Sequence, residues 1–322
     1  MVDDTQNQNQ SECADFSPIN ETSGGYIIVK DLPLKDRIRR RFYFASANFL
    51  AKFGAKGVYR LADIAATFAW VLYKKRRELA ISNISERLNL PYEEARVMAR
   101  SAFTSNMRSF MESILIPGYD YKNANLKIEG GEILDEIHKI DRPVILVTGH
   151  LGSWEFITAL CKIIVTNGRH GLVIMRRYAD PAFNELMSCL RASHGVELVG
   201  HRNAVKPILK TLHANGFVAF LVDHHVASGS ESLTMPFLGK ETVVNKGPAV
   251  MATRTGALIL PCALFRTDNG HVLHVEPFLD PSTLSGTNDE KIRQICEFYT
   301  LAMERLIKMH PEQWFWMHNR WK

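Results

Sequence analysis

The chain has 322 residues, of which 46% are hydrophobic and 23% are charged. This composition is typical of a folded protein with one large domain or two modest ones. Its five scattered cysteines form no C-x-x-C pair, which argues against a disulfide framework or a structural zinc site. The net charge is only +5, but residues 26–77 hold 13 Lys and Arg residues against three acids. The basic excess therefore sits in one early segment, and we expect no nucleic-acid partner.

Residues 1–25 are polar and acidic, which predicts a disordered tail without the apolar stretch of a signal peptide. Residues 26–120 are predicted to form a helical, membrane-proximal region. Within it, residues 34–56 and 61–73 combine aromatic side chains with Lys and Arg, and neither run approaches the roughly 20 apolar residues of a spanning helix. Two interpretations stay open. The helices either attach the protein to an anionic membrane surface, or pack on the core and expose a basic face.

The pattern changes after Gly130 and Gly131, where short apolar runs begin to alternate with helical stretches. Buried runs of this kind, with helical segments between them, predict an α/β fold with a mostly parallel central sheet flanked by helices. We expect residues 121–322 to form this core and to make one structural domain with the helices before it. The predicted strands are 143–149, 171–175, 217–223 and 257–265.

The stretch PVILVTGHLGSWE predicts a buried strand, a tight turn at Gly149 and Gly152, and a helix from about Ser153. His150 ends the strand and Glu155 falls in the first turn of the helix. The break between the two elements lets their side chains meet, whereas residues five apart on one helix point about 140° away from each other. A histidine held by a carboxylate is the minimal general-base unit. The alternative is an ordinary strand-end histidine and an acid that complements the helix dipole.

A second candidate stretch is LVDHHVA, in which Asp223, His224 and His225 follow an apolar run. Metal-dependent phosphoesterases of the DHH type carry these three letters at a strand end, so a metal site is the competing hypothesis. Such a site needs further carboxylates to hold two cations, and no two aspartates lie two apart before residue 223. We therefore expect no metal, and interpret Asp223 as a strand-end carboxylate that points into the same cleft as His150.

Five landmarks occur in order along the chain and together resemble one family. This is the late acyltransferases of lipid A biosynthesis, of the lauroyl and myristoyl type, within the lysophospholipid acyltransferase superfamily. The resemblance runs from about residue 30 to the end of the chain. It rests on RRELAISNI (76–84), HLGSWE (150–155), DHH (223–225), MPFLGKETVVNKGPAVMATRTGALILP (235–261) and the terminal HPEQWFWMHNRWK.

The resemblance implies that His150 deprotonates the acceptor hydroxyl, which then attacks the thioester of the acyl donor. The matching carboxylate is Glu155. In some relatives an acid of the later motif, here Asp223, contacts the histidine instead, so the two acids remain alternatives. The resemblance also matches Arg176 or Arg177, with Arg176 favoured, to an arginine that follows the next strand and helps to hold a phosphate or to stabilise the site.

Four further residues are expected to contact substrate. The backbone amides of Gly152 and Ser153, at the start of the helix, are a candidate oxyanion site. Lys246 and Arg254 are candidates for contacts to an anionic headgroup. The tryptophan-rich C-terminal segment has three possible roles: an interfacial aromatic belt, part of the acceptor's phosphate site, or a cap on the core.

The function that the resemblance implies is O-acyl transfer from acyl carrier protein to a hydroxyl of a Kdo-bearing lipid IVA precursor, without a cofactor. Acyl-CoA-dependent transfer to a phosphatidylinositol mannoside or another glycolipid is the alternative within the same fold, because donor and acceptor contacts are not encoded in motifs. The expected partners are acyl carrier protein and a glycolipid acceptor in the membrane. The expected location is the cytoplasmic face of the inner membrane, with peripheral or monotopic attachment.

Overall fold

Strand β2 (Val144–Thr148) lies near the middle of a seven-stranded sheet whose order is β1-β9-β8-β2-β5-β3-β4. The structure is a computed structural model that describes residues 33–321, with gaps at 166–168, 203 and 226–231. The predicted acidic tail, residues 1–25, lies outside the described residues.

The sheet is parallel at every pairing except that between β8 and β9, which is antiparallel. A separate antiparallel hairpin joins β6 and β7. Besides β2, the strands are β1 (Leu126–Glu129), β3 (Gly171–Met175), β4 (Glu197–Gly200), β5 (Phe217–Leu221), β6 (Ser232–Phe237), β7 (Lys240–Asn245), β8 (Leu258–Thr267) and β9 (Gly270–Val275).

Helices cover both faces of the sheet, so every residue of β2 is buried. Val144 and Leu146 pack into the cluster on the side of α6 and α7, and the alternate residues Ile145 and Val147 pack on the side of α9, α10 and α11. This burial on two faces explains why the strand reads as a continuous apolar run. The helices of the core are α6 (Gly131–Lys139), α7 (Ile157–Ile164), α8 (Pro181–Ala192), α9 (Val205–His213), α10 (Gly247–Thr255) and α11 (Asn288–Met309).

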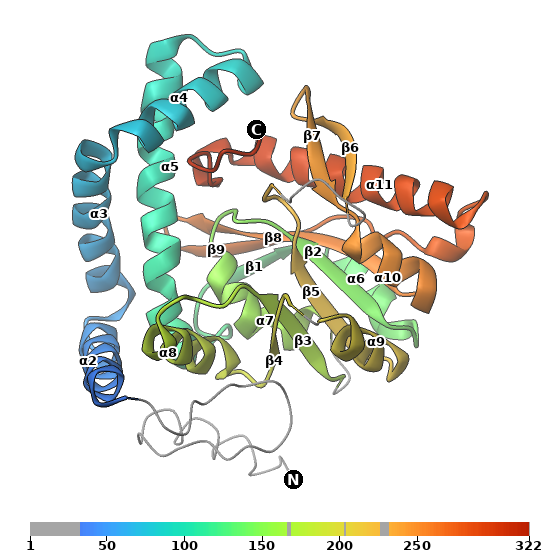
Figure 1. The fold of residues 1–322 in the computed structure, drawn as a ribbon, viewed down its shortest axis with the longest axis horizontal. Helices are drawn as coiled ribbons and strands as arrows, with labels where there is room; N and C mark the ends of the chain where they lie inside the picture. Colours follow the sequence, from blue (N-terminus) through green and yellow to red (C-terminus); the bar gives the residue numbers. More distant parts are fainter. Residues whose placement is uncertain (1–32, 166–168, 203, 226–231, 322) are drawn as a thin grey trace.

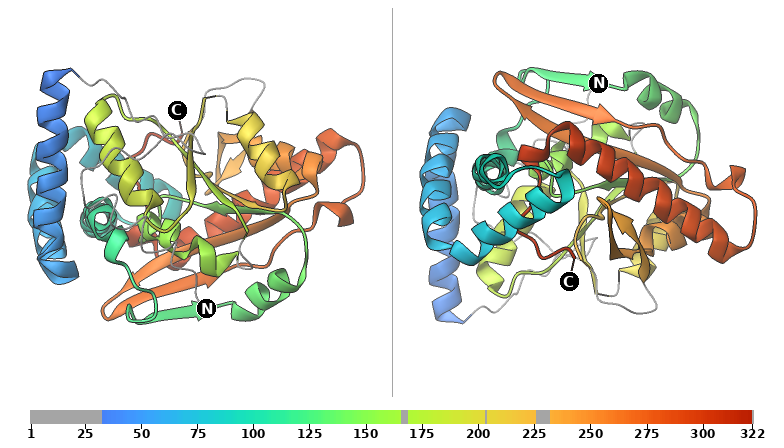
Figure 2. Two further views of the ribbon diagram at one scale, coloured as in Figure 1. Left: turned by 90° about the horizontal axis from the view of Figure 1, so that it is seen from below. Right: turned by 90° about the horizontal axis from the view of Figure 1, so that it is seen from above.

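Four helices before the sheet form a layer along one side of the molecule (Figures 1 and 2). Helix α5 lies against the core, α3 packs on α5, and α2 packs on α8. No helix among the described residues combines the length and apolar character needed to cross a membrane. The four helices are α2 (Leu34–Ala51), α3 (Gly54–Leu72), α4 (Lys74–Leu88) and α5 (Tyr92–Glu112), and short 3₁₀ turns follow at η1 (Ser113–Gly118), η2 (Trp154–Phe156), η3 (Pro281–Thr283) and η4 (Pro311–Gln313).

The predicted α/β fold with a mostly parallel sheet is confirmed, and each of the four apolar runs contains one strand. Five further strands were not predicted: β1, β4, β6, β7 and β9. Each contains polar or charged residues, so none has the continuous apolar run that identified the buried strands. The division into a membrane-proximal region (26–120) and a core (121–322) stays a prediction.

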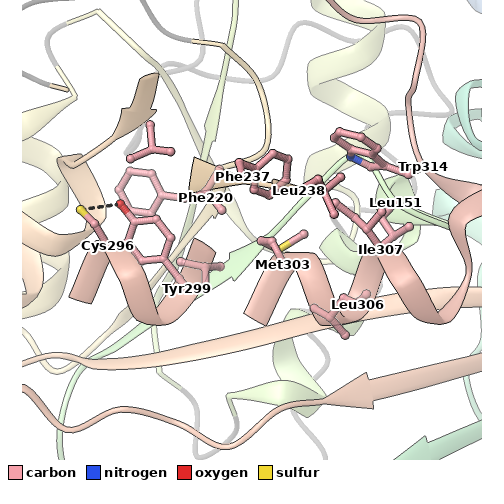
Figure 3. Packing of buried hydrophobic residues seen from close by; sticks show 14 of the residues in the cluster. Leu151, Phe220, Phe237, Leu238, Cys296, Tyr299, Met303, Leu306, Ile307 and Trp314 are labelled. Carbon is pink, nitrogen blue, oxygen red and sulfur yellow. Dashed lines mark hydrogen bonds between the residues drawn. The ribbon is translucent and has the colours of Figure 1, made fainter. Parts of the chain in front are cut away.

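Buried core residues hold the turn after β2 in place. Leu151 belongs to the same buried cluster as Met303 and Ile307 of α11 (Figure 3), and it pairs with Trp314 in an isolated bridge. Gly152 has a φ of +60°, and a Cβ atom there would lie 2.1 Å from the carbonyl oxygen of Leu264. The turn therefore requires glycine for both its backbone conformation and its close approach to β8.

We expect Gly152→Ala to lower the free energy of unfolding by about 2 kcal/mol or more, because a left-handed backbone and a backbone clash act together. The matched control is Gly118→Ala, since no atom lies within 4 Å of a Cβ at Gly118. Urea denaturation of both variants measures the difference. Equal stabilities for the two variants would contradict the requirement for glycine at residue 152.

Candidate active site

The register of the sheet brings His150 and Asp223 together. Thr148 of β2 pairs with Leu221 of β5 in a parallel ladder, so the residues two positions beyond each strand end lie side by side. The Nδ1 atom of His150 is 2.9 Å from Oδ1 of Asp223, and the backbone N–H of His150 donates to Oδ2 at 2.8 Å. The carboxylate thus fixes both the backbone and the ring of the histidine.

Asp223 is only 2% exposed and has a third donor, the indole N–H of Trp314, 2.9 Å from Oδ2. Burial alone would raise the pKa of this carboxyl, but the charge and hydrogen bond of His150 outweigh burial, with help from Trp314, and hold the pKa of Asp223 well below its usual range. Asp223 is therefore ionised at neutral pH, as a group that stabilises an imidazolium must be.

Glu155 has a different partner. Its carboxylate forms a two-pronged ion pair with Arg191 of α8, with N–O distances of 2.8 and 2.6 Å. Arg191 also donates to the hydroxyl of Tyr178 at 3.2 Å, and Glu155 is itself buried. Of the two carboxylates that the sequence left open, Asp223 is the one that the structure places on His150, and Glu155 ties η2 to α8.

The backbone amides of Gly152 and Ser153 already donate hydrogen bonds within the protein. The N–H of Gly152 donates to the carbonyl of Gln313 at 3.0 Å, and that of Ser153 donates to the carbonyl of Leu264 at 2.7 Å. The side chain of Ser153 is fully buried. In this structure, therefore, neither amide is free to donate to an oxyanion, and the expected oxyanion site at the start of the helix is not formed.

Ser153 instead joins a buried polar network centred on Glu112 at the end of α5. One oxygen of Glu112, Oε1, accepts hydrogen bonds from Tyr59 (2.7 Å), Ser153 (3.0 Å) and Arg266 (2.8 Å). Burial opposes ionisation of Glu112, but the charge of Arg266 and the hydrogen bonds that the carboxylate accepts together outweigh burial and lower the pKa of the acid. The network connects α3, α5 and β8 to the turn that carries His150.

The sequence analysis did not identify this network, although a signal was present. The buried face of α5 runs through Ala99, Ala102, Asn106 and Ser109 at helical spacing, and Glu112 continues it. A charged residue on the buried face of a predicted helix requires a buried partner, and Arg266 near the end of β8 is that partner. Its position could not be obtained from the sequence, because the pair is 154 residues apart.

The other predicted substrate contacts lie on different elements. Arg176 and Arg177 are exposed in the segment after β3, a strand that β5 separates from β2. Lys246 directly precedes α10, and Arg254 is exposed in the last turn of that helix. The proposed contacts of these four residues with substrate stay predictions.

Aromatic rings surround the accessible side of His150. Its ring makes an edge contact with Trp154, at a centroid distance of 5.4 Å, and a tilted contact with Phe315 at 6.2 Å. Phe110 of α5 contacts the rings of both Trp154 and Phe315, and it is exposed to solvent. An apolar wall of this kind suits an apolar ligand group next to the histidine.

The C-terminal segment is built mainly into the core. Trp314 and Trp316 are buried and pack edge to face at 4.6 Å, and Arg320 is also buried, with its guanidinium 5.1 Å from the ring centroid of Phe237. For these residues, the interpretation as a core cap is correct and the interfacial belt is wrong. Trp314 adds a contact that the sequence did not predict, its hydrogen bond to Asp223.

Three residues of the site could in principle hold a metal. Within the described part of the chain, His150, Asp223 and His224 bring possible ligand atoms within 4.8 Å of one another. The lone pairs of an imidazole lie in the ring plane, so an ion shared by both histidines must lie in both planes at about 2.0–2.1 Å from each nitrogen. The two rings are parallel, with an interplanar angle of 4° and a centroid distance of 3.7 Å. This arrangement suits a hydrogen-bonded His–Asp pair better than a shared ion.

We therefore expect a chelator to leave the melting temperature unchanged, because the pair works through hydrogen bonds. Elemental analysis of the purified protein, with thermal unfolding before and after chelation, measures this. One equivalent of manganese or zinc, lost together with stability on chelation, would contradict the assignment and favour a metal-dependent phosphoesterase.

The comparison with known proteins agrees with this geometry. Residues 36–322 match the bacterial lipid A biosynthesis acyltransferase family. The phosphatidylinositol mannoside acyltransferase of Mycolicibacterium smegmatis is 20% identical over 230 residues, which cover 70% of this chain and 72% of the relative. The protein of that name from Mycobacterium tuberculosis is 23% identical over 198 residues, 60% of this chain and 59% of the relative. Because the family match covers far more than half of the sequence, the chain belongs to the bacterial lipid A biosynthesis acyltransferases and is an O-acyltransferase.

Proposed function

We propose that the protein transfers a fatty acyl chain from a thioester to a hydroxyl of a membrane glycolipid, with His150 as general base and Asp223 as its orienting carboxylate. The observation that carries this proposal is the double hydrogen bond from the ring and backbone of His150 to Asp223. It leaves the Nε2 atom of His150 as the nitrogen for proton transfer.

The reaction follows from this arrangement. As the acceptor hydroxyl oxygen attacks the thioester carbonyl carbon, Nε2 of His150 takes the hydroxyl proton, and the new positive charge lies next to the Asp223 carboxylate. Collapse of the tetrahedral intermediate breaks the carbon–sulfur bond. The proton on Nε2 then passes to the leaving thiolate, so the base returns to its starting state with a new ester and a free thiol as products.

For the donor we propose acyl carrier protein, and for the acceptor a Kdo-bearing lipid IVA precursor. Membership of the lipid A biosynthesis acyltransferase family supports this choice of acceptor. Acyl-CoA-dependent transfer to a phosphatidylinositol mannoside is the alternative, because two relatives carry that acceptor in their names. Parallel assays with both donors and both acceptors, read by mass spectrometry, separate the two proposals.

We further propose that α2 and α3 lie on the cytoplasmic surface of the inner membrane. The buried face of α3 consists of Val58, Ala62, Ala66 and Ala69, whereas most of the large apolar side chains of both helices are exposed, although Phe44 of α2 is buried. A helix on the surface of a water-soluble protein normally has the reverse arrangement. Among the described residues, 11 of the 19 exposed large hydrophobics lie between residues 34 and 73: Leu34, Ile38, Phe42, Phe49, Phe53, Leu61, Ile64, Phe68, Val71, Leu72 and Tyr73.

The charge on the exposed face of α2 and α3 also supports binding to a lipid surface. Exposed basic side chains accompany the apolar ones, and each basic residue near an anionic leaflet contributes about 1 kcal/mol to binding. Both helices carry exposed aromatic and basic side chains, which is the composition of an interfacial helix. The exposed basic residues from 34 to 76 are Lys35, Arg37, Arg39, Arg41, Lys52, Lys56, Arg60, Lys74, Lys75 and Arg76.

The pairing of the carboxylates predicts distinct effects for two conservative changes. Asp223→Asn is expected to reduce turnover by about 10³-fold or more, because the amide leaves the imidazolium without its counter-charge. Glu155→Gln is expected to retain turnover but to lower stability by about 3 kcal/mol, because it leaves Arg191 buried and unpaired. Acyl transfer and thermal unfolding of both variants, with His150→Ala as the inactive reference, measure these effects. Near-full activity of His150→Ala or Asp223→Asn would overturn the proposed mechanism.

The membrane face is tested by a triple change, Phe42→Ser, Phe49→Ser and Phe68→Ser. We expect binding to vesicles that contain anionic phospholipid to fall about tenfold or more, because three large apolar side chains no longer enter the interface. The control carries Val205→Ser, Leu301→Ser and Met309→Ser, which are also exposed apolar positions but lie outside α2 and α3. If both triple variants bind like the original protein, α2 and α3 do not form the docking face.

A further inference from the structure

Three imidazole rings stack in a row at the active site. The ring of His150 lies parallel to that of His224, with a centroid distance of 3.7 Å and an interplanar angle of 4°. His224 in turn stacks on His318 of the C-terminal segment, at 4.2 Å and 7°. The three rings come from segments far apart in the sequence: the turn after β2, the end of β5 and the C-terminus.

Only the first ring of the row is hydrogen-bonded to a carboxylate, that of Asp223. The Nε2 atom of His224 and the Nδ1 atom of His318 are buried, and neither has a hydrogen-bond partner among the described residues. The second and third rings therefore contribute an aromatic face to the site and no hydrogen bond from these nitrogens. Phe315 lies against the rings of both His150 and His224, at 6.2 and 5.8 Å, and closes one side of the row.

The surroundings keep the second and third rings neutral. Burial lowers the pKa of His224 to about 3 and that of His318 to about 4. Asp223 favours a positive charge on either ring, whereas His150 and the buried cation Arg320 oppose it, and burial is the largest cause for both rings. The charged and titratable groups that face the two rings are His150, Asp223, His225 and Arg320.

We propose that His224 and His318 are positioning residues, which hold the ring plane of His150 and give its positive charge a neutral aromatic face during acyl transfer. A cation gains stabilisation over an aromatic face, and parallel stacking restricts rotation of the His150 ring, which a single hydrogen bond at Nδ1 leaves possible. This inference rests on the proposed role of His150 as the base. It also gives a function to the second letter of the DHH motif that requires no metal.

The test compares two substitutions of one ring in the full-length protein. His224→Leu removes the aromatic face, and His224→Phe keeps the face while removing both ring nitrogens. The matched control is His213→Leu, an exposed position at the end of α9. The primary readout is the pH midpoint of the His150 signal in nuclear magnetic resonance spectra of protein with isotope-labelled histidine. The second is the pH dependence of kcat and KM.

Without the aromatic face at residue 224 the charged form of His150 is less stable, so the pH midpoint of the His150 signal must fall. In His224→Leu we expect a fall of about 0.5 to 1 pH unit, a similar displacement of the acidic limb of the rate profile, and a kcat about tenfold lower at nearly unchanged KM. His224→Phe is expected to restore most of the midpoint and of kcat. A merely structural role would lower the melting temperature without this recovery by phenylalanine.

Two results would overturn the proposal: an unchanged midpoint in His224→Leu, or an equal fall in His224→Leu and His224→Phe. If His224→Leu does not fold, His318→Leu takes its place, with a smaller fall expected because its ring is one layer further from His150, and an unchanged midpoint there overturns the proposal as well. The midpoint is measured without turnover. An active His150→Ala protein would therefore refute the proposed base while leaving the stack to be judged by its own result.

Discussion

The hydrogen bonds between His150 and Asp223 are the interaction on which the rest of the site depends, and the sheet imposes them. Parallel pairing of β2 with β5 sets the two residues at equal distances beyond the strand ends, and helices on both faces of the sheet bury the carboxylate. Trp314 then brings the last residues of the chain to the same carboxylate. Three segments, separated by 73 and 91 residues, thus converge on one buried negative charge, which must be hydrogen-bonded to be stable there.

A second constraint acts on the turn itself. In the turn after β2, Gly152 lies close to β8 and Ser153 donates a hydrogen bond to Glu112. Glu112 also accepts a hydrogen bond from Tyr59 of α3. The helix that carries much of the exposed apolar face is therefore joined to the catalytic turn by two hydrogen bonds through one buried acid. Partial loss of such a network leaves a buried charge unpaired and costs more than its complete replacement, so removal of Arg266 alone, the partner of Glu112, is expected to destabilise both the turn and α3.

The sequence predicted the features that depend on local pattern. The apolar runs identified four buried strands, the glycines identified the turn, and the spacing of aromatic and basic residues identified the two exposed helices. It could not choose between Glu155 and Asp223, because the choice depends on the register of β2 against β5 and on Arg191 of α8, which pairs with Glu155. For the same reason the sequence could not show that the amides of Gly152 and Ser153 already donate hydrogen bonds within the protein. Their acceptors, the carbonyl groups of Gln313 and Leu264, are more than 100 residues away in the chain.

A double-mutant cycle on the turnover of His150→Ala and Asp223→Asn tests the central claim most directly. Two residues that act as one unit give strongly non-additive effects, so the double variant should be no slower than His150→Ala alone. The same cycle with Glu155→Gln provides the comparison, since Glu155 has no role in proton transfer in this account. Additive losses for His150 and Asp223, or a non-additive pair of His150 and Glu155, would contradict the assignment of Asp223 as the carboxylate that holds the base.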